Sequence, residues 1–259
     1  MIIDTHCHLY MDAFDADREA VIARAREHGV RYLVNVGIDP ATNQASHELA
    51  KSHDFIFHTA GFHPHNAGEF SDALYRETEQ LVENTRPVAI GEIGLDYFKS
   101  QSSREAQKTC FARMIGLALS KNLPVIVHSR DAFADTVEIL KSEGRGKLRG
   151  VMHCFSYDLA SAKILFDMGF LASFTCNLTF KNTSALLEVA RSVPLDRVML
   201  ETDSPYLAPK IYRGKRNEPA CLTHLADFLA DKRGIAREEV RKTTSENAIR
   251  FFGLGVAHE

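Results

Sequence analysis

Eight short apolar segments rich in β-branched residues alternate along this chain with segments of helical periodicity. The apolar segments cover residues 1–4, 32–38, 55–62, 87–94, 123–129, 148–155, 170–177 and 197–203. The clearest helical segments are 15–29, 104–122 and 158–169, and Gly29, Asn122 and Gly169 stand where a helix is expected to end. Strands that alternate with helices predict βαβ units and a parallel sheet. Because the apolar segments lack strict polar alternation, we expect strands that are covered on both faces.

The number of these units predicts a particular α/β architecture. About eight βα units in a chain of 259 residues indicate a (β/α)8 TIM barrel of parallel strands. A doubly wound sheet is the alternative, but it does not need eight repeats, and no G-x-G-x-x-G turn is present. No Gly, Ser or Pro-rich linker divides the chain, so we expect one domain over residues 1–259.

The composition limits the class of protein further. The chain is 45% hydrophobic with a net charge of −3, so any polyanion must meet a local cluster of positive charge. The five cysteines are scattered without a C-x-x-C pair, which favours a reducing compartment over a disulfide framework. No signal peptide or membrane span is recognisable. We therefore expect a cytoplasmic protein that does not contact membranes.

Histidine or carboxylate residues follow all but the second and seventh predicted strands. In a barrel of this class the active site lies at the carboxyl ends of the strands. A strand turns every second residue to the same face, so His6 and His8 share a face, and Cys7 is expected on the other. A lone His-x-His is more often structural than metal-binding, but strand-end residues repeated in this way predict a metal site. In chain order they are His6, His8, His63, His65, Glu92, His128, His153, Glu201 and Asp203.

This set exceeds what one tetrahedral metal site requires. Imidazole and carboxylate ligands suit Zn, Mn, Fe or Mg. We expect two divalent ions (Mg, Mn or Zn), or three, with two of them bridged by a hydroxide and by Glu92. Asp203 can ligate one ion and accept the proton of the attacking water, so Glu92 and Asp203 are the predicted catalytic residues. The predicted reaction class is hydrolysis.

Positive charge follows the last predicted strand. The segment 208–220, "APKIYRGKRNEPA", contains Lys210, Arg213, Lys215 and Arg216, with Asn217 beside them. A basic cluster in an acidic chain fits a phosphate clamp, and a solvated surface loop is the alternative. Aromatic side chains such as Phe98 could stack on bases. The predicted substrate-binding residues are His63, His65, Arg130, Glu201, Arg213, Arg216 and Asn217.

The sequence resembles the TatD family of metal-dependent hydrolases. The resemblance runs through "IIDTHCHL", "GFHPH", "AIGEIGLDY", "VIVHSRDA", "HCFS", "LETDSPYLAP" and "RGKRNEP", in order over nearly the whole chain. It implies a (β/α)8 barrel and metal-dependent DNase activity that includes 3′–5′ exonuclease action. It also implies a shared carboxylate, Glu92, within the ligand set His6, His8, Glu92, His128, His153 and Asp203.

Three functions remain open at this point. The first is a two-metal phosphodiesterase that trims single-stranded or frayed DNA ends, with DNA or another phosphate-bearing nucleic acid as its partner. The second is hydrolysis of a carboxylic ester or amide such as aminoacyl-tRNA. The third is a metal-stabilised binding protein without turnover.

Overall fold

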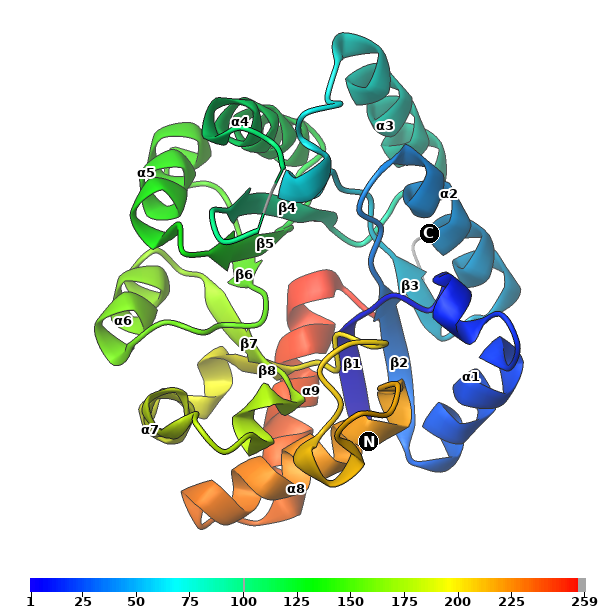
Figure 1. Ribbon diagram of the computed structural model, residues 1–259, viewed down its shortest axis with the longest axis vertical. Coiled ribbons are helices and arrows are strands. Elements are labelled where there is room, and N and C mark those ends of the chain that lie inside the picture. The colour runs from blue at the N-terminus through cyan, green and yellow to red at the C-terminus, as the bar shows by residue number, and fades with distance from the viewer. Residues whose placement is uncertain (100, 256–259) are drawn as a thin grey trace. The chain divides into compact units, whose positions relative to one another are not determined.

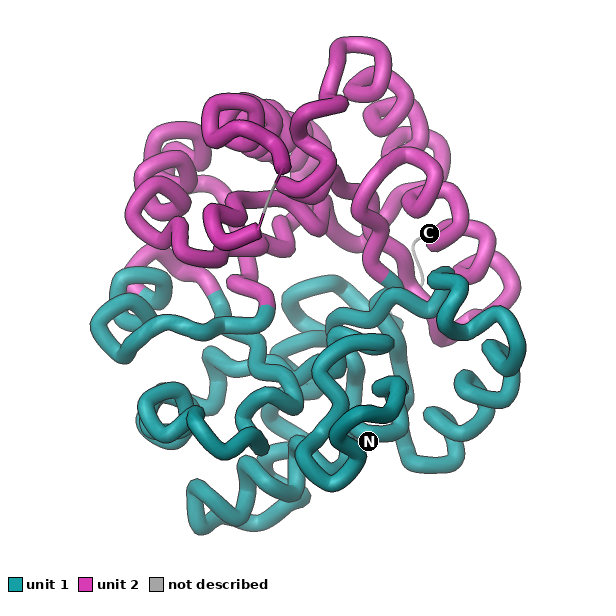
Figure 2. The backbone as a smooth tube through the Cα atoms, in the orientation of Figure 1, with its two compact units in different colours: residues 1–35, 154–166, 171–259 teal, residues 36–153, 167–170 magenta. Residues whose placement is uncertain are grey.

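The computed structural model describes residues 1–99 and 101–255, which form two compact units (Figure 2). Unit 1 comprises Met1–Asn35, Cys154–Phe166 and Leu171–Glu259, and unit 2 comprises Val36–His153 and Asp167–Phe170. The chain thus enters unit 2 twice, for residues 36–153 and again for 167–170, and returns to unit 1 each time. The single domain expected over 1–259 extends past the described residues and stays a prediction.

Unit 1 contains the first two strands and the last two. These are β1 (Ile2–Cys7), β2 (Val30–Asn35), β7 (Leu171–Phe174) and β8 (Val198–Leu200). β1 pairs with β2 and β7 with β8, both in parallel, and a parallel bridge joins Cys7 to Ser204 just after β8. Its helices are α1 (Arg18–Glu27), α6 (Leu159–Asp167, whose last residue belongs to unit 2), α7 (Ser184–Ser192), α8 (Leu222–Arg233) and α9 (Arg237–Phe252) (Figure 1).

Unit 2 contains the four middle strands. They are β3 (Ile56–His58), β4 (Ile90–Asp96), β5 (Val125–Arg130) and β6 (Gly150–Met152). β4 pairs with β5 and β5 with β6 in parallel, and Ala60 after β3 forms a parallel bridge with Ile90. Four helices belong to this unit: α2 (Pro40–Ser52), α3 (Asp72–Thr85), α4 (Arg104–Ser120) and α5 (Phe133–Gly144). α4 packs on β4 and α5 (Figure 1).

The alternation of strands and helices confirms the predicted α/β class. Each of the eight apolar segments contains or overlaps one strand, and a helix follows every strand. All residues of β1 and β4 are buried, as expected for strands covered on both faces. Gly29, Asn122 and Gly169 follow α1, α4 and α6 with φ of 82°, 53° and 81°, the left-handed conformation that ends helices.

Two glycines allow the backbone around β4 to approach its neighbours closely. A Cβ on Gly61 would lie 2.3 Å from the backbone nitrogen of Glu92. Gly94 has φ +142°, and a Cβ there would lie 2.0 Å from the carbonyl oxygen of His128. No other residue fits either position, because an L side chain would collide with the backbone. The "GEIG" sequence therefore fixes how Glu92 lies beside the His128 strand.

Candidate metal-ligating groups

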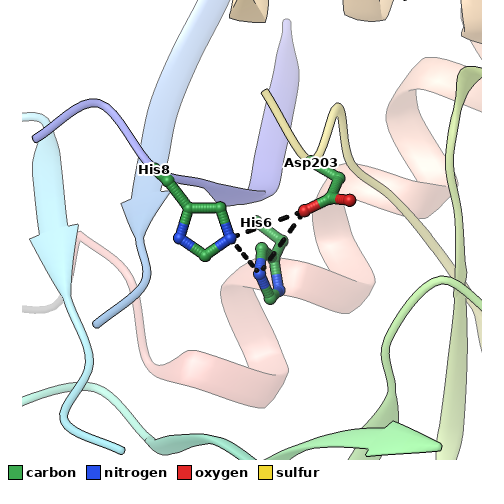
Figure 3. A group of neighbouring side chains, drawn as sticks. All are labelled: His6, His8 and Asp203. Carbon is green, nitrogen blue, oxygen red and sulfur yellow. Dashed lines mark hydrogen bonds and ion pairs between the residues drawn. The ribbon is translucent and has the colours of Figure 1, made fainter. Parts of the chain in front are cut away.

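The first group of ligand-type side chains lies in unit 1. The Nε2 atoms of His6 and His8 are 3.1 Å apart, and both point toward Oδ1 of Asp203 (Figure 3). That oxygen lies 3.5 Å from Nε2 of His8 and 3.9 Å from Nε2 of His6. His6 is completely buried, whereas the Asp203 side chain keeps 15% of its surface exposed. Two imidazoles and one carboxylate thus converge at a partly accessible point.

Backbone pairing between the ends of β1 and β8 brings this group together. The amide of Asp203 donates to the carbonyl of His6 at 2.8 Å, and the amide of His8 donates to the carbonyl of Ser204 at 2.8 Å. Asp203 itself has φ 56°, a left-handed conformation that aspartate tolerates better than most residues. Cys7, between the two histidines, is buried with its sulfur 3.5 Å from the carbonyl of Val34, so it faces away as expected.

A buried carboxylate supports the segment before Asp203. Asp4 accepts hydrogen bonds from the amide of His6, at 3.3 Å, and from both the amide and the hydroxyl of Thr202. Burial raises the pKa of Asp4 to about 7, although the Thr202 and His6 hydrogen bonds oppose this shift. The side-chain amide of Asn217 donates to the carbonyl of Thr202 at 2.9 Å. Asp4 and Asn217 therefore fix the backbone that carries Asp203.

The second group surrounds one oxygen of Glu92 in unit 2. Oε1 of Glu92 lies 2.7 Å from Nδ1 of His128, 3.5 Å from Nε2 of His63 and 3.7 Å from Nε2 of His153. Glu92 is 3% exposed. The rings of His128 and His153 are stacked with centroids 6.2 Å apart. Three imidazoles, from the loop after β3, from β5 and from the residue after β6, thus meet one buried carboxylate.

A further carboxylate, which the sequence analysis did not single out, holds this second group. Oδ2 of Asp96 lies 3.0 Å from Nε2 of His128 and 2.9 Å from Nε2 of His65. Burial opposes ionisation of Asp96, but hydrogen bonds from His128 and from two backbone amides hold its pKa well below its usual value. For His128, burial favours the neutral imidazole, yet hydrogen bonds to Asp96 and Glu92 outweigh it and raise the pKa.

The donor chemistry of both groups fits divalent metal ions. The ligand-type atoms of His6, His8 and Asp203 lie within 4.8 Å of one another, and so do those of His63, Glu92 and His128. Imidazole nitrogen with carboxylate oxygen suits Zn, Mn or Fe, whereas Mg would need more oxygen ligands, such as carboxylates and water. His63, predicted to bind substrate, therefore lies in a ligand-type group. Its position directly after the apolar segment 55–62 was the signal for this role, although β3 itself already ends at His58.

Of the other predicted substrate-binding residues, some are exposed and others are held by hydrogen bonds or ion pairs within the protein. Arg130 and Arg213 are exposed, and the Arg130 guanidinium lies 4.0 Å from the centre of the exposed Phe98 ring. Arg216 instead forms a bidentate ion pair with Asp17, with N–O distances of 2.7 and 2.8 Å. That pair lowers the pKa of Asp17 to about 2.

Three further predicted substrate residues also have internal partners. Asn217 is completely buried, and its side chain donates to the carbonyl of Thr202 and accepts from the backbone amide of Glu218. Glu201 is 1% exposed, and its carboxylate accepts from the amide of Cys154 at 2.7 Å. His65 is 44% exposed and bonds Asp96. Substrate contact by these residues stays a prediction.

Comparison with known proteins places this α/β chain, with its histidine–carboxylate groups, among metal-dependent hydrolases. The sequence model of the "TatD related DNase" family matches residues 3–253. The metal-dependent hydrolase YabD of Bacillus subtilis is 40% identical, over 98% of this chain and 100% of the relative. The "3'-5' ssDNA/RNA exonuclease TatD" of Pantoea ananatis is 34% identical, over 98% and 100%.

A solved structure of a TatD homologue has the same fold as this chain. The TatD homologue YJJV of Escherichia coli superposes with a TM-score of 0.92 at 27% identity, over 98% of each chain. The chain belongs to the TatD related DNase family, and its fold is the (β/α)8 class predicted from the sequence. Among residues 1–99 and 101–255, no helix combines the length and apolar character needed to cross a membrane.

Proposed function

We propose that this metal-dependent hydrolase is a phosphodiesterase that removes nucleotides from the 3′ ends of single-stranded or frayed DNA. The observation that carries the proposal is the convergence of imidazole and carboxylate atoms in the His6–His8–Asp203 group and around Glu92. The family match supports hydrolysis, and the named activity of the Pantoea ananatis relative supports nucleic acid as the substrate class.

Each group has a distinct part in the proposed reaction. A divalent ion, when bound, would lower the pKa of a water molecule and stabilise negative charge on the phosphoryl oxygens. His6 and His8 present their Nε2 atoms as ligands, and His128 presents Nδ1 beside Glu92. We propose one ion for each group, and the bridging role of Glu92 stays a prediction. Asp203, partly exposed beside the two histidines, would accept the proton of the attacking water.

The surface after β4 and β5 supports a nucleic-acid substrate. Phe98 is 51% exposed, with the Arg130 guanidinium 4.0 Å and the Lys99 ammonium 5.6 Å from its ring centre. A base can stack on an exposed aromatic ring or on a guanidinium plane, and both cations can bind phosphate. Arg130 follows the ligand-type His128 by two residues. We propose that this trio, Phe98, Lys99 and Arg130, holds the strand that is cleaved.

The test is cleavage of an oligonucleotide labelled at its 5′ end, and of a second labelled at its 3′ end, with Mg²⁺ or Mn²⁺. We expect progressive shortening from the 3′ end, loss of cleavage with a chelator, and recovery when the metal is added back. His128→Ala should reduce the rate by about three orders of magnitude, because several kcal/mol of transition-state stabilisation depend on the ion. His28→Ala, which changes an exposed histidine outside both groups, is the matched control.

Hydrolysis of carboxylic esters is measured on the same preparation. The proposal is wrong if metal-loaded protein leaves both oligonucleotides intact while it hydrolyses an aminoacyl ester. It is also wrong if metal-loaded protein hydrolyses neither, since that result favours a binding protein without turnover. Cleavage that His128→Ala leaves at the wild-type rate would point to a contaminating nuclease.

A further inference from the structure

Asp96 is a buried carboxylate of unit 2 that lies outside the predicted ligand set. It is the last residue of β4 and is 1% exposed. Its Oδ2 contacts the Nε2 atoms of His65 and His128, and its Oδ1 accepts from the amides of Phe98, at 2.9 Å, and Lys99, at 3.2 Å. Four donors thus surround a carboxylate that sits directly behind a ligand-type histidine.

The backbone of Asp96 is fixed as well. Gln107, buried on α4, accepts from the amide of Asp96 at 2.8 Å and donates to its carbonyl at 3.0 Å. The same Gln107 amide group donates to the carbonyl of Ser102 at 3.1 Å. The carboxylate therefore has a defined position before any ligand arrives.

The contacts of His128 determine which of its nitrogens can bind a metal. An ionised carboxylate only accepts hydrogen bonds, so Nε2 of His128 must carry the proton that faces Asp96. Nδ1 lies 2.7 Å from the Glu92 carboxylate, so it too carries a proton while no metal ion is bound. A metal ion bound there would take the place of that proton, and the Nδ1 lone pair would be the ligand. A carboxylate behind a ligating histidine fixes its tautomer and orientation in this way.

We propose that Asp96 is a positioning residue that keeps the proton of His128 on Nε2 and so assigns Nδ1 as the metal ligand beside Glu92. This inference rests on the metal-ligand role given to His128 in the proposed function, but not on the substrate. Asp96 also joins that ligand to the backbone of Phe98 and Lys99, where the nucleic-acid strand is proposed to bind.

Asp96→Asn is a sharp test, because the surroundings dictate how the new amide must lie. The two backbone amides at the Oδ1 position require an acceptor, so the asparagine oxygen should take that place. The asparagine NH2 then faces Nε2 of His128, which must accept, so the imidazole becomes neutral with its single proton on Nδ1. The metal-ligand lone pair beside Glu92 is lost, although the volume of the side chain hardly changes.

The first measurement is made on the wild-type chain, and a variant serves only to assign the signals. In Zn²⁺-loaded protein labelled with ¹⁵N-histidine, long-range ¹H–¹⁵N spectra show which nitrogen of His128 carries the proton, with His128→Ala for the assignment. We expect a proton on Nε2 and zinc on Nδ1. Zinc on Nε2, or no zinc-dependent change at His128, overturns the proposal, and neither result depends on nuclease activity.

The second measurement is Zn²⁺ affinity by competition with a chelating dye. Asp96→Asn should weaken the affinity about 10–100-fold, and in the metal-free spectrum His128 should lose its Nε2 proton and keep the one on Nδ1. Gln107→Ala is the matched control, because it loosens the backbone of Asp96 but keeps the carboxylate. If Gln107→Ala weakens Zn²⁺ binding as much as Asp96→Asn, Asp96 acts only through the fold of its loop and the proposal is wrong.

Discussion

The two ligand-type groups are assembled by different kinds of contact. Backbone hydrogen bonds between the ends of β1 and β8 set the positions of His6, His8 and Asp203. Around Glu92, a side chain orients the imidazole nearest to the carboxylate, because Asp96 holds His128 from behind. Backbone pairing depends little on side-chain identity, whereas a side-chain contact is lost with one substitution. We therefore expect the Glu92 group to be more sensitive to change in the residues around its ligands.

The largest effect is expected from Glu92→Gln, which removes the negative oxygen that three imidazoles approach. Turnover should fall by roughly three orders of magnitude, and the protein should lose metal, because several kcal/mol of charge stabilisation depend on that carboxylate. Metal content by elemental analysis and the single-turnover rate check this expectation. Full metal content with normal turnover would show that the group around Glu92 is structural.

Asp4→Ala tests the group of His6, His8 and Asp203 by removing the buried carboxylate that holds its backbone. The substitution leaves the amide of His6 and both donors of Thr202 without their buried acceptor. We expect the free energy of unfolding to fall by about 3 kcal/mol, measured by urea denaturation. Asp4→Asn, which retains an acceptor oxygen, is the control and should cost clearly less. If the two variants are equally stable, the carboxylate of Asp4 does not support the Asp203 segment.

Acid pH should weaken unit 2 through His58, the buried last residue of the strand that precedes His63. Burial lowers the pKa of His58 to about 4, and its Nε2 lies 2.9 Å from the hydroxyl of Thr85. The unfolded chain binds the proton at about pH 6.5, so this contribution to stability is complete above that pH. It is lost as pH falls toward 4 and amounts to roughly 3 kcal/mol at most.

Urea denaturation at several pH values between 7 and 4 checks the size of this effect. His58→Gln removes the titrating group but can keep the hydrogen bond to Thr85, so its stability should depend less on pH than that of the wild type. An identical pH dependence in both proteins would contradict the buried, neutral state of His58.

The smallest effects are expected from the basic segment after β8. Arg213 is exposed, whereas Arg216 is paired with Asp17, so Arg213→Ala should weaken binding of a single-stranded oligonucleotide more than Arg216→Ala. For a phosphate contact, the slope of log affinity against log salt should fall by about 1. Arg216→Ala should instead release Asp17 from its bound guanidinium and raise its pKa from about 2. Equal salt slopes in both variants would show that Arg216 also meets phosphate.

The fold class could be predicted from the sequence because its signal is local. The pleat and the helical turn repeat every 2.0 and 3.6 residues, so apolar runs and helical segments reveal strands and helices without any long-range contact. His8, His153 and Asp203 follow their strands, as predicted. The predicted strand-end positions of Glu92 and His128 were wrong, because β4 and β5 continue to Asp96 and Arg130. Strand lengths were overestimated, as for β3, which covers only three residues of the segment 55–62.

The α/β repeat and the residues with metal-binding chemistry could both be predicted from the sequence alone. The side-chain pairs could be recognised only in the folded chain. In it, His63 lies beside Glu92, Arg216 pairs with Asp17, and Asp96 contacts His128. The physical reason is that hydrogen-bond geometry depends on distances of a few tenths of an ångström between groups far apart in the chain. Residue spacing carries no such information. Asp96 ends β4, the strand that already contains the predicted ligand Glu92. Its role could be recognised only from its contacts with His128 and His65.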